Sequence, residues 1–255
     1  MRSVVRHLFL AVAIMALAMV GSGAANTMMI DRSPPGADIG TVASITPSAG
    51  RTVGIAHPVT IRFDADVADR AAAERAVSIT ADRPLPGTFA WAGDRQLTWS
   101  PTGYLPANAT IGVRFGDQVR TEFATNAGVV ADADMSAHTF TVSIGGQVVR
   151  VMPASMGKPG WETPTGTFPV LEKFRHIVFD SRTIGIPLDS PEGYLIDGEY
   201  GVRLTWSGVF VHSAPWSVDS QGYANVSHGC INLAPGDAAW YYENAGIGDP
   251  VTTHW

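Results

Sequence analysis

Glycine and proline interrupt this chain at short intervals, which favours short strands joined by turns. The 255 residues include 27 glycines and 17 prolines, a composition that is typical of many turns rather than of long helices. Val59, Ile61 and Phe63 alternate with polar residues, which is the pattern of a half-buried strand. Because 45% of the residues are hydrophobic and only 16% are charged, such strands can enclose real cores. The sequence therefore predicts a mainly β protein.

The N-terminal residues have the pattern of an export signal. Two arginines and a histidine precede an apolar run over residues 8–20, and small residues follow this run up to Ala25. We expect a signal peptide over residues 1–25 and an exported protein that acts in the periplasm or cell wall. An uncleaved segment that tethers the protein to the membrane is the alternative, although the run is shorter than the ~20 residues a bilayer-spanning helix needs.

The charge balance excludes one class of partner. Removal of residues 1–25 would take away two arginines and no acid, so the net charge would move from −6 to about −8. Such a chain lacks the basic surface that nucleic acids require, and no nucleic-acid partner is expected. Residues 26–40 show no sustained hydrophobic period and are expected to form a flexible leader.

Residues 41–125 have the pattern of a small β-sandwich. Asp69 precedes an alanine-rich stretch over residues 70–76, which predicts one short helix with an acidic N-cap. Several short strands at near-regular spacing are typical of an immunoglobulin-like domain. The strands predicted here, besides the one at Val59, cover residues 88–91, 96–99 and 110–115.

A second β-rich unit is expected over residues 126–255. Residues 125–137 are interpreted as a linker, and Gly145-Gly146 predicts a hairpin between strands at 139–144 and 147–152. Residues 208–212 read as a strand that runs into a loop. The best helix covers 235–244, with a proline in its first turn and Gly246 after its end.

Chemistry is expected at the single cysteine, Cys230. An exported chain with one cysteine cannot close an intrachain disulfide, so this thiol serves another purpose. A free thiol titrates near 8.5, and a neighbouring histidine, His212 or His228, can take its proton and leave a nucleophilic ion pair. Gly229 permits a backbone geometry closed to other residues, which would help aim the amides of Gly229 and Cys230 at a developing oxyanion.

Two other interpretations of this cysteine stay open on the residues alone. Free cysteine is often a small buried hydrophobe, and the apolar neighbours Ile231 and Leu233 fit that role. Zinc is the other interpretation, because His212, His228 and Cys230 would supply two nitrogens and a thiolate. Their spacing lacks the close ligand pair that is usual in a structural zinc site.

The surroundings of the cysteine resemble a known signature. His212 followed by the run 227–232 (Ser-His-Gly-Cys-Ile-Asn) is similar to the signature of the L,D-transpeptidase (YkuD-domain) family. The stretch 209–218 (Val-Phe-Val-His-Ser-Ala-Pro-Trp-Ser-Val) and a Thr-Pro-x-Gly-x-Phe segment at 163–168 strengthen the resemblance. It extends from about Val42 to Trp255 and is closest to mycobacterial members, in which an immunoglobulin-like domain precedes the catalytic domain.

The resemblance implies a fold and catalytic roles. The implied fold is mainly β: an immunoglobulin-like β-sandwich followed by a β-rich YkuD-type catalytic domain with one or two short helices. Cys230 would be the nucleophile and His212 its base, with the backbone carbonyl of Ser213 orienting the histidine. His228 and Gly229 would shape the oxyanion region.

The resemblance also implies substrate-facing residues. Asn232 would brace the nucleophile loop, and Tyr194 matches a tyrosine on a flap that covers the family's active site. Trp216 would line the cleft, with ordinary aromatic packing as an equal alternative. Phe179 stands where a methionine often precedes the Asp180-Ser181 pair, which leaves the catalytic pair untouched but changes the donor pocket.

The implied activity is cross-linking of peptidoglycan. Stem peptides would be the substrates, diaminopimelate residues of two stems would be joined through a cysteine acyl-enzyme, and D-alanine would leave. Carbapenem β-lactams would acylate the same thiol, and neither a metal nor an organic cofactor is expected. An L,D-carboxypeptidase that uses the same site and a non-catalytic cell-wall-binding protein are the alternatives.

Overall fold

The computed structural model describes residues 39–255. The expected signal peptide (1–25) and almost all of the expected leader (26–40) lie outside the described residues. Within residues 39–255, no helix has the length and apolar character needed to cross a membrane.

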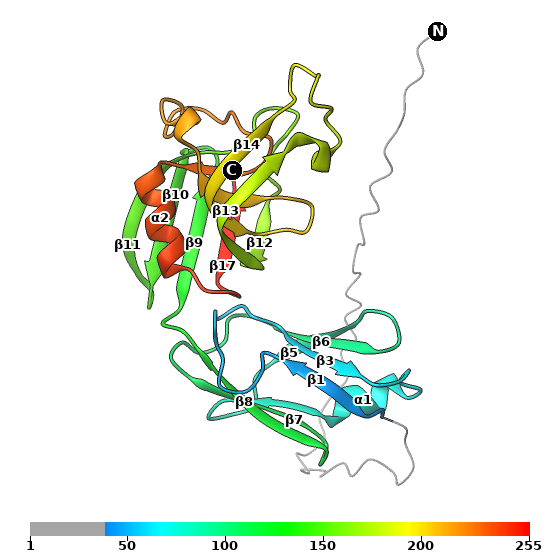
Figure 1. Ribbon diagram of the computed structural model, residues 1–255. Helices are drawn as coiled ribbons and strands as arrows, with labels where there is room; N and C mark the ends of the chain where they lie inside the picture. The colour runs from blue at the N-terminus through cyan, green and yellow to red at the C-terminus, as the bar shows by residue number, and fades with distance from the viewer. Residues whose placement is uncertain (1–38) are drawn as a thin grey trace, which may run out of the picture. The chain divides into compact units, whose positions relative to one another are not determined.

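The first domain consists of two four-stranded sheets that enclose one core (Figure 1). One sheet has the order β1-β3-β6-β5 and the other has the order β2-β8-β7-β4. This arrangement confirms the predicted sandwich. The strands are β1 (Val42–Thr46), β2 (Thr52–Val53), β3 (Val59–Phe63), β4 (Val77–Thr80), β5 (Gly87–Trp91), β6 (Gln96–Pro101), β7 (Thr110–Phe115) and β8 (Val119–Thr125).

The sandwich core is formed by the alternating residues that the sequence pattern selects. Val59, Ile61 and Phe63 of β3 are all buried, whereas the intervening Arg62 is exposed. The Phe63 ring meets Phe115 of the opposite sheet edge to face at a centroid distance of 5.4 Å. Period-two alternation therefore places one face of each strand in the core.

The predicted helix of this domain is present as α1 (Arg70–Ala76). The Asp69 carboxylate accepts a hydrogen bond of 2.8 Å from the Ala72 amide, which satisfies one of the free donors of the first turn. This confirms the predicted acidic N-cap.

The second domain is built on one nine-stranded sheet with the order β12-β17-β9-β10-β11-β16-β15-β14-β13. The predicted hairpin and the predicted helix are both present. The elements are β9 (Val129–Asp134), β10 (Thr139–Ile144), β11 (Gln147–Ser155), β12 (Gly166–Pro169), β13 (Glu172–Asp180), β14 (Leu195–Arg203), β15 (Phe210–Ser213), β16 (Ile231–Leu233), α2 (Pro235–Asn244), β17 (Pro250–His254) and two 3-10 turns (Ser181–Ile184 and Pro215–Ser217).

The interpretation of residues 125–137 as a linker is wrong. Residues 129–134 form β9, which pairs with β10 on one side and with β17 on the other. Val129, Ala131 and Ala133 are buried while the residues between them stay partly exposed. Alanine and aspartate are depleted in strands, so the composition of this segment did not indicate a strand, although its residues alternate between buried and partly exposed positions.

The candidate functional residues lie on or next to two neighbouring parallel strands of this mixed sheet. β15 pairs in parallel with β16, and β14 pairs with the other edge of β15 in the antiparallel sense. Helix α2 follows β16, and its fully buried Tyr241 meets Phe140 of β10 edge to face at 4.9 Å. The helix thus holds one face of the sheet next to the strands that lead to the site.

We predict that Phe140→Ala destabilises the catalytic domain by about 3–5 kcal/mol, because it opens a cavity against Tyr241. The free energy of unfolding from denaturant titrations measures this effect. Val148→Ala in the adjoining strand β11 is the matched control, because Val148 is 61% exposed and a surface change of this kind usually stays within about 0.5 kcal/mol. Equal stabilities for the two variants would contradict this description of the core.

Candidate active site

Parallel pairing of β15 and β16 brings residues distant in the sequence to one place. His212 and Asn232 are register partners, and Cys230 directly precedes β16. Both Cys230 and His212 line a cavity of about 300 Å³. Tyr194, Trp216, His228 and Asn232 line it too, whereas Ser213 and Gly229 do not. The full lining is Phe179, Tyr194, Ile196, His212, Trp216, Ser217, Ser220, Val226, Ser227, His228, Cys230 and Asn232.

The His212 ring is fixed in one orientation and one tautomer. Its Nδ1 lies 2.8 Å from the carbonyl oxygen of Ser213. A carbonyl only accepts hydrogen bonds, so Nδ1 carries the hydrogen and Nε2 keeps a free lone pair in the neutral ring. The centroid of the imidazole lies 4.3 Å from that of the Phe179 ring and 5.9 Å from that of the Trp216 ring. The contact expected of the Ser213 carbonyl is therefore present, and Nε2 is left available as a base.

Burial keeps both members of the pair uncharged. It lowers the pKa of His212 to about 4, against a smaller opposing effect of the Ser213 carbonyl. It raises the pKa of Cys230 to about 11, and the Phe210 amide only partly opposes this. The Sγ atom lies 3.6 Å from the Gly208 carbonyl oxygen, an acceptor that suits a thiol hydrogen. At neutral pH these pKa values leave the thiol and the imidazole uncharged rather than as the expected ion pair, because a poorly solvated site disfavours charge.

The loop before the cysteine is closed by a serine hydroxyl. Ser227 Oγ accepts a hydrogen bond of 3.1 Å from the Gly229 amide and donates one of 2.6 Å to the Cys230 carbonyl. Gly229 has a φ of +114°, a conformation that L side chains rarely adopt. The expectation that the Gly229 amide faces the oxyanion is therefore wrong for this arrangement, because Ser227 occupies that amide.

The buried Asn232 is bonded to the 3-10 turn that follows β15, and its expected bracing of the nucleophile loop stays a prediction. Its Nδ2 donates to Ser217 Oγ at 3.1 Å, and Ser217 also accepts from Gln221. The Asn232 Oδ1 has no partner among the described residues. Trp216 is 49% exposed and lines the cavity, which favours the cleft-lining role over interior packing.

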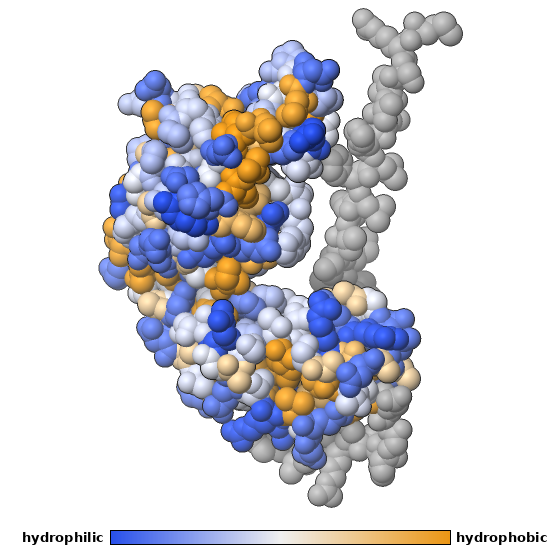
Figure 2. Space-filling view, viewed as in Figure 1, coloured by the Kyte–Doolittle hydropathy of each residue, from blue (hydrophilic) through white to orange (hydrophobic). Residues whose placement is uncertain are grey.

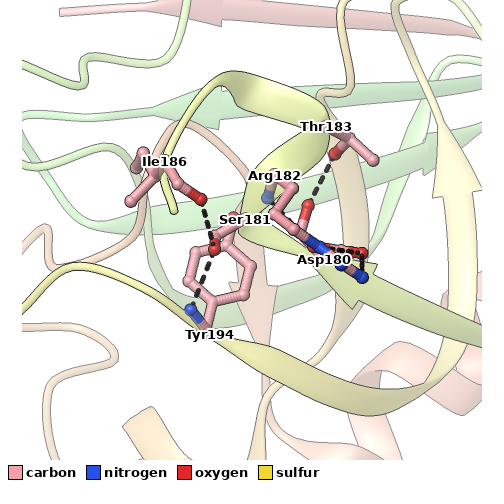
Figure 3. A network of polar contacts seen from close by, with 6 residues as sticks. All are labelled: Asp180, Ser181, Arg182, Thr183, Ile186 and Tyr194. Carbon is pink, nitrogen blue, oxygen red and sulfur yellow. Dashed lines mark hydrogen bonds and ion pairs between the residues drawn. The ribbon is translucent and has the colours of Figure 1, made fainter. Parts of the chain in front are cut away.

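The flap expected from Tyr194 is the connection between β13 and β14. The fully buried Ser181 lies where this connection leaves β13, and its hydroxyl joins the two ends of the connection by hydrogen bonds (Figure 3). The Ser181 hydroxyl donates to the Ile186 carbonyl at 2.9 Å and accepts from the Tyr194 amide at 3.0 Å. Figure 2 shows an apolar strip in the region of β13 and β14. Val178 of β13 and Leu195 of β14 are each 57% exposed.

A charged cluster joins this flap to the nucleophile loop. Glu192 Oε2 accepts hydrogen bonds from Lys158 Nζ at 2.6 Å and from His228 Nε2 at 2.7 Å. The bond from Lys158 is the main reason that the pKa of the Glu192 carboxyl is lowered, with His228 second. The centroid of the His228 ring also lies 5.2 Å from that of Trp161 and 5.3 Å from that of Tyr194. The His228 side chain therefore contacts the flap at both Glu192 and Tyr194.

No set of metal ligands accompanies the cysteine. Residues 39–255 contain no group of three or more His, Cys, Asp or Glu side chains that is placed to hold a metal ion. The zinc interpretation of His212, His228 and Cys230 thus lacks its ligand geometry.

Sequence reasoning did not single out three polar residues that organise the site. Thr163, Ser181 and Glu192 contact the backbone or side chains of the nucleophile loop and the flap. Thr163 opens the Thr-Pro-x-Gly-x-Phe segment and Ser181 belongs to the Asp-Ser pair, so both lay within quoted patterns. Their partners come from distant loops, and no periodicity indicates such contacts.

Comparisons with known proteins agree with the geometry. Residues 128–252 match the model of the L,D-transpeptidase catalytic domain (YkuD), and residues 22–117 match that of a bacterial Ig domain. L,D-transpeptidase 1 of Mycobacterium tuberculosis (strain ATCC 25618 / H37Rv) is 49% identical over 252 residues, which cover 98% of each chain.

Solved structures show the same likeness. An L,D-transpeptidase from Mycobacterium smegmatis is 53% identical, with a TM-score of 0.80 over 84% of this chain and 99% of that one. An L,D-transpeptidase solved in complex with imipenem is 49% identical, with a TM-score of 0.79 over the same shares. The fold and the site thus define a transpeptidase with an Ig-like domain ahead of its catalytic domain. The chain belongs to the L,D-transpeptidase family.

The neutral state of the pair predicts a steep pH dependence of thiol alkylation. With a Cys230 pKa of about 11, the thiolate fraction and the rate with iodoacetamide should rise about tenfold per pH unit from pH 7 to 10. Intact-mass analysis reports this site alone, because the chain has one cysteine. Glutathione is the reference thiol. A rate that is already constant below pH 8 would instead indicate a persistent ion pair with His212.

Proposed function

We propose that this protein cross-links peptidoglycan stems by way of a thioester on Cys230. The donor is a tetrapeptide stem, and the bond attacked joins its diaminopimelate residue to the terminal D-alanine. The acceptor is the side-chain amine of diaminopimelate on a second stem. The product joins the third residues of two stems, and D-alanine is released.

One observation carries this proposal: a neutral imidazole with a free Nε2 lines the same cavity as the only thiol of the chain. The Nδ1 of His212 is tied to the Ser213 carbonyl at 2.8 Å, so the ring presents its basic nitrogen without needing to reorient. Cys230 is partly buried rather than sealed in the core. These features support a nucleophile and base pair over a structural cysteine.

The acylation step moves one proton and exchanges one bond. As Sγ of Cys230 bonds to the donor carbonyl carbon, the thiol hydrogen passes to Nε2 of His212. The carbonyl oxygen becomes an oxyanion that backbone amides stabilise. The intermediate collapses when the carbon–nitrogen bond breaks, and His212 returns the proton to the departing amino group of D-alanine. A thioester and a neutral imidazole remain.

The second step reverses these roles with a new amine. The acceptor amine attacks the thioester carbonyl in its uncharged form, and Nε2 of His212 takes a proton from it. The carbon–sulfur bond then breaks and the sulfur recovers its hydrogen from the imidazolium. The enzyme returns to the neutral pair from which it began.

The arrangement of cavities favours an amine acceptor over water. A second cavity of about 260 Å³ also reaches Cys230 and His228, and its lining includes Arg203, Trp206 and Gly208. Two cavities that share the thiol suit a reaction with two large substrates, one on each side of the thioester. A carboxypeptidase needs only one such cavity, because water requires no binding surface of this size.

Covalent inhibition and location follow from the same proposal. A carbapenem presents a strained lactam carbonyl that Cys230 can open, and the imipenem complex of a relative 49% identical supports this. Peptidoglycan stems lie outside the cytoplasmic membrane, so we place the action of the protein in the periplasm or cell wall. The predicted signal peptide over residues 1–25 supports that location.

We predict one covalent imipenem adduct on the wild-type protein and none on Cys230→Ala. Loss of the only sulfur nucleophile removes the acyl acceptor but leaves the fold, because alanine fits in the space of the thiol. Intact-mass spectrometry measures the adduct, and circular dichroism checks that the variant is folded. An adduct on the folded alanine variant would place the acylation elsewhere.

We also predict that purified tetrapeptide stems are converted to cross-linked dimers with release of D-alanine. Mass spectrometry separates the dimer from the tripeptide that hydrolysis would give. Cys230→Ala should give neither product. Formation of the tripeptide alone would assign the protein as a carboxypeptidase, and full activity of Cys230→Ala would contradict the cysteine mechanism.

A further inference from the structure

We propose that Thr163 is a positioning residue that aims the backbone amide of Cys230 at the oxyanion. This inference rests on the proposed function, because it concerns the tetrahedral intermediate of that reaction. Thr163 does not line the cavity at Cys230 and contacts no reacting atom. Its effect is transmitted through one peptide group.

The Thr163 hydroxyl links two loops inside the protein. The residue is only 2% exposed. Its Oγ1 donates a hydrogen bond of 2.9 Å to the Gly229 carbonyl and accepts one of 3.0 Å from the Gly157 amide. Because the single hydroxyl hydrogen is donated to the Gly229 carbonyl, its direction is defined. Thr163 thereby fixes the position of the Gly229 oxygen.

Fixing that oxygen also fixes the amide of the nucleophile. The Gly229 carbonyl and the Cys230 N–H belong to the same planar peptide group, in which they point in opposite directions. Gly229 has a φ of +114°, where glycine has more freedom than any other residue. Without the bond from Thr163, rotation at Gly229 would swing the Cys230 amide away.

The Cys230 amide is the group that this arrangement leaves available. The neighbouring Gly229 amide is held by Ser227 Oγ. The Cys230 amide, in contrast, meets no hydrogen-bond acceptor among residues 39–255. An unpaired amide at the nucleophile is suited to bind an oxyanion when one forms.

The surrounding backbone leaves little room for an alternative arrangement. The 157–163 loop is joined to the nucleophile loop by a hydrogen bond of 3.0 Å from the Lys158 amide to the Ser227 carbonyl. A side chain at Gly157 would meet the Trp161 carbonyl oxygen at 2.1 Å, so the loop closes tightly on itself. The Thr163 hydroxyl sits where these two loops meet.

The test compares Thr163→Val with the wild-type protein in two reactions of the same thiol. Valine keeps the shape of threonine and removes the hydroxyl. Acylation by imipenem passes through a tetrahedral oxyanion and should slow by about 10- to 100-fold, since losing a whole oxyanion donor typically costs about 10²–10³ in rate. Alkylation by iodoacetamide forms no oxyanion and should keep its rate and its pH profile.

Conservative and matched variants complete the design. Thr163→Ser keeps the hydroxyl and should restore most of the acylation rate. Thr165→Val makes the same change two residues away at an exposed position and should behave as wild type. Should the valine variant fail to fold, Thr163→Ala removes the hydroxyl without adding a methyl group and is measured in the same way.

The outcomes separate this inference from the proposed function. If the wild-type protein is not acylated by imipenem at all, the proposed function fails. If the wild type is acylated and Thr163→Val reacts equally fast, the positioning role is overturned. Equal losses in acylation and alkylation would also overturn it, because they would reflect general disorder of the loop.

Discussion

The parallel pairing of β15 with β16 is the constraint on which the rest of the site depends. It sets His212 level with Asn232, two residues after Cys230, which directly precedes β16. A slip of one residue would turn His212 to the other face of the sheet. Both strands are buried on both faces, so such a slip would set the polar His212 and Asn232 against the core that now holds Val211, Ile231 and Leu233. Core packing thus enforces catalytic geometry.

Burial gives this pair a character different from that of an exposed thiolate. The pKa of His212 falls to about 4 and that of Cys230 rises to about 11, so at neutral pH both side chains are uncharged. In the proposed reaction a proton would move only when a carbonyl carbon is present to accept the sulfur. Reactivity would then arise in the transition state, in which imidazolium and oxyanion stabilise one another in a poorly solvated site.

The sequence predicted most of the architecture because the physical signals were local. Alternation located β3, and proline and glycine located α2. The strand β9 was missed, since its alanines and aspartates disguise a two-residue period. The motif brought His212 and Cys230 together, but their charge states depend on enclosure by residues such as Phe179 of β13. The engagement of the Gly229 amide depends on one Ser227 rotamer, which no pattern encodes.

The contacts around the nucleophile loop indicate how a loop that contains a glycine can be ordered. Gly229 supplies a backbone conformation that other residues resist, and that freedom alone would leave the loop undefined. Ser227 fixes it from within by bonding the Gly229 amide and the Cys230 carbonyl, and Thr163 fixes it from another loop by bonding the Gly229 carbonyl. Each polar atom of the loop that is tied in this way removes one alternative conformation. Within residues 39–255 the Cys230 amide has no such partner, which leaves it free to bind the oxyanion of the proposed reaction.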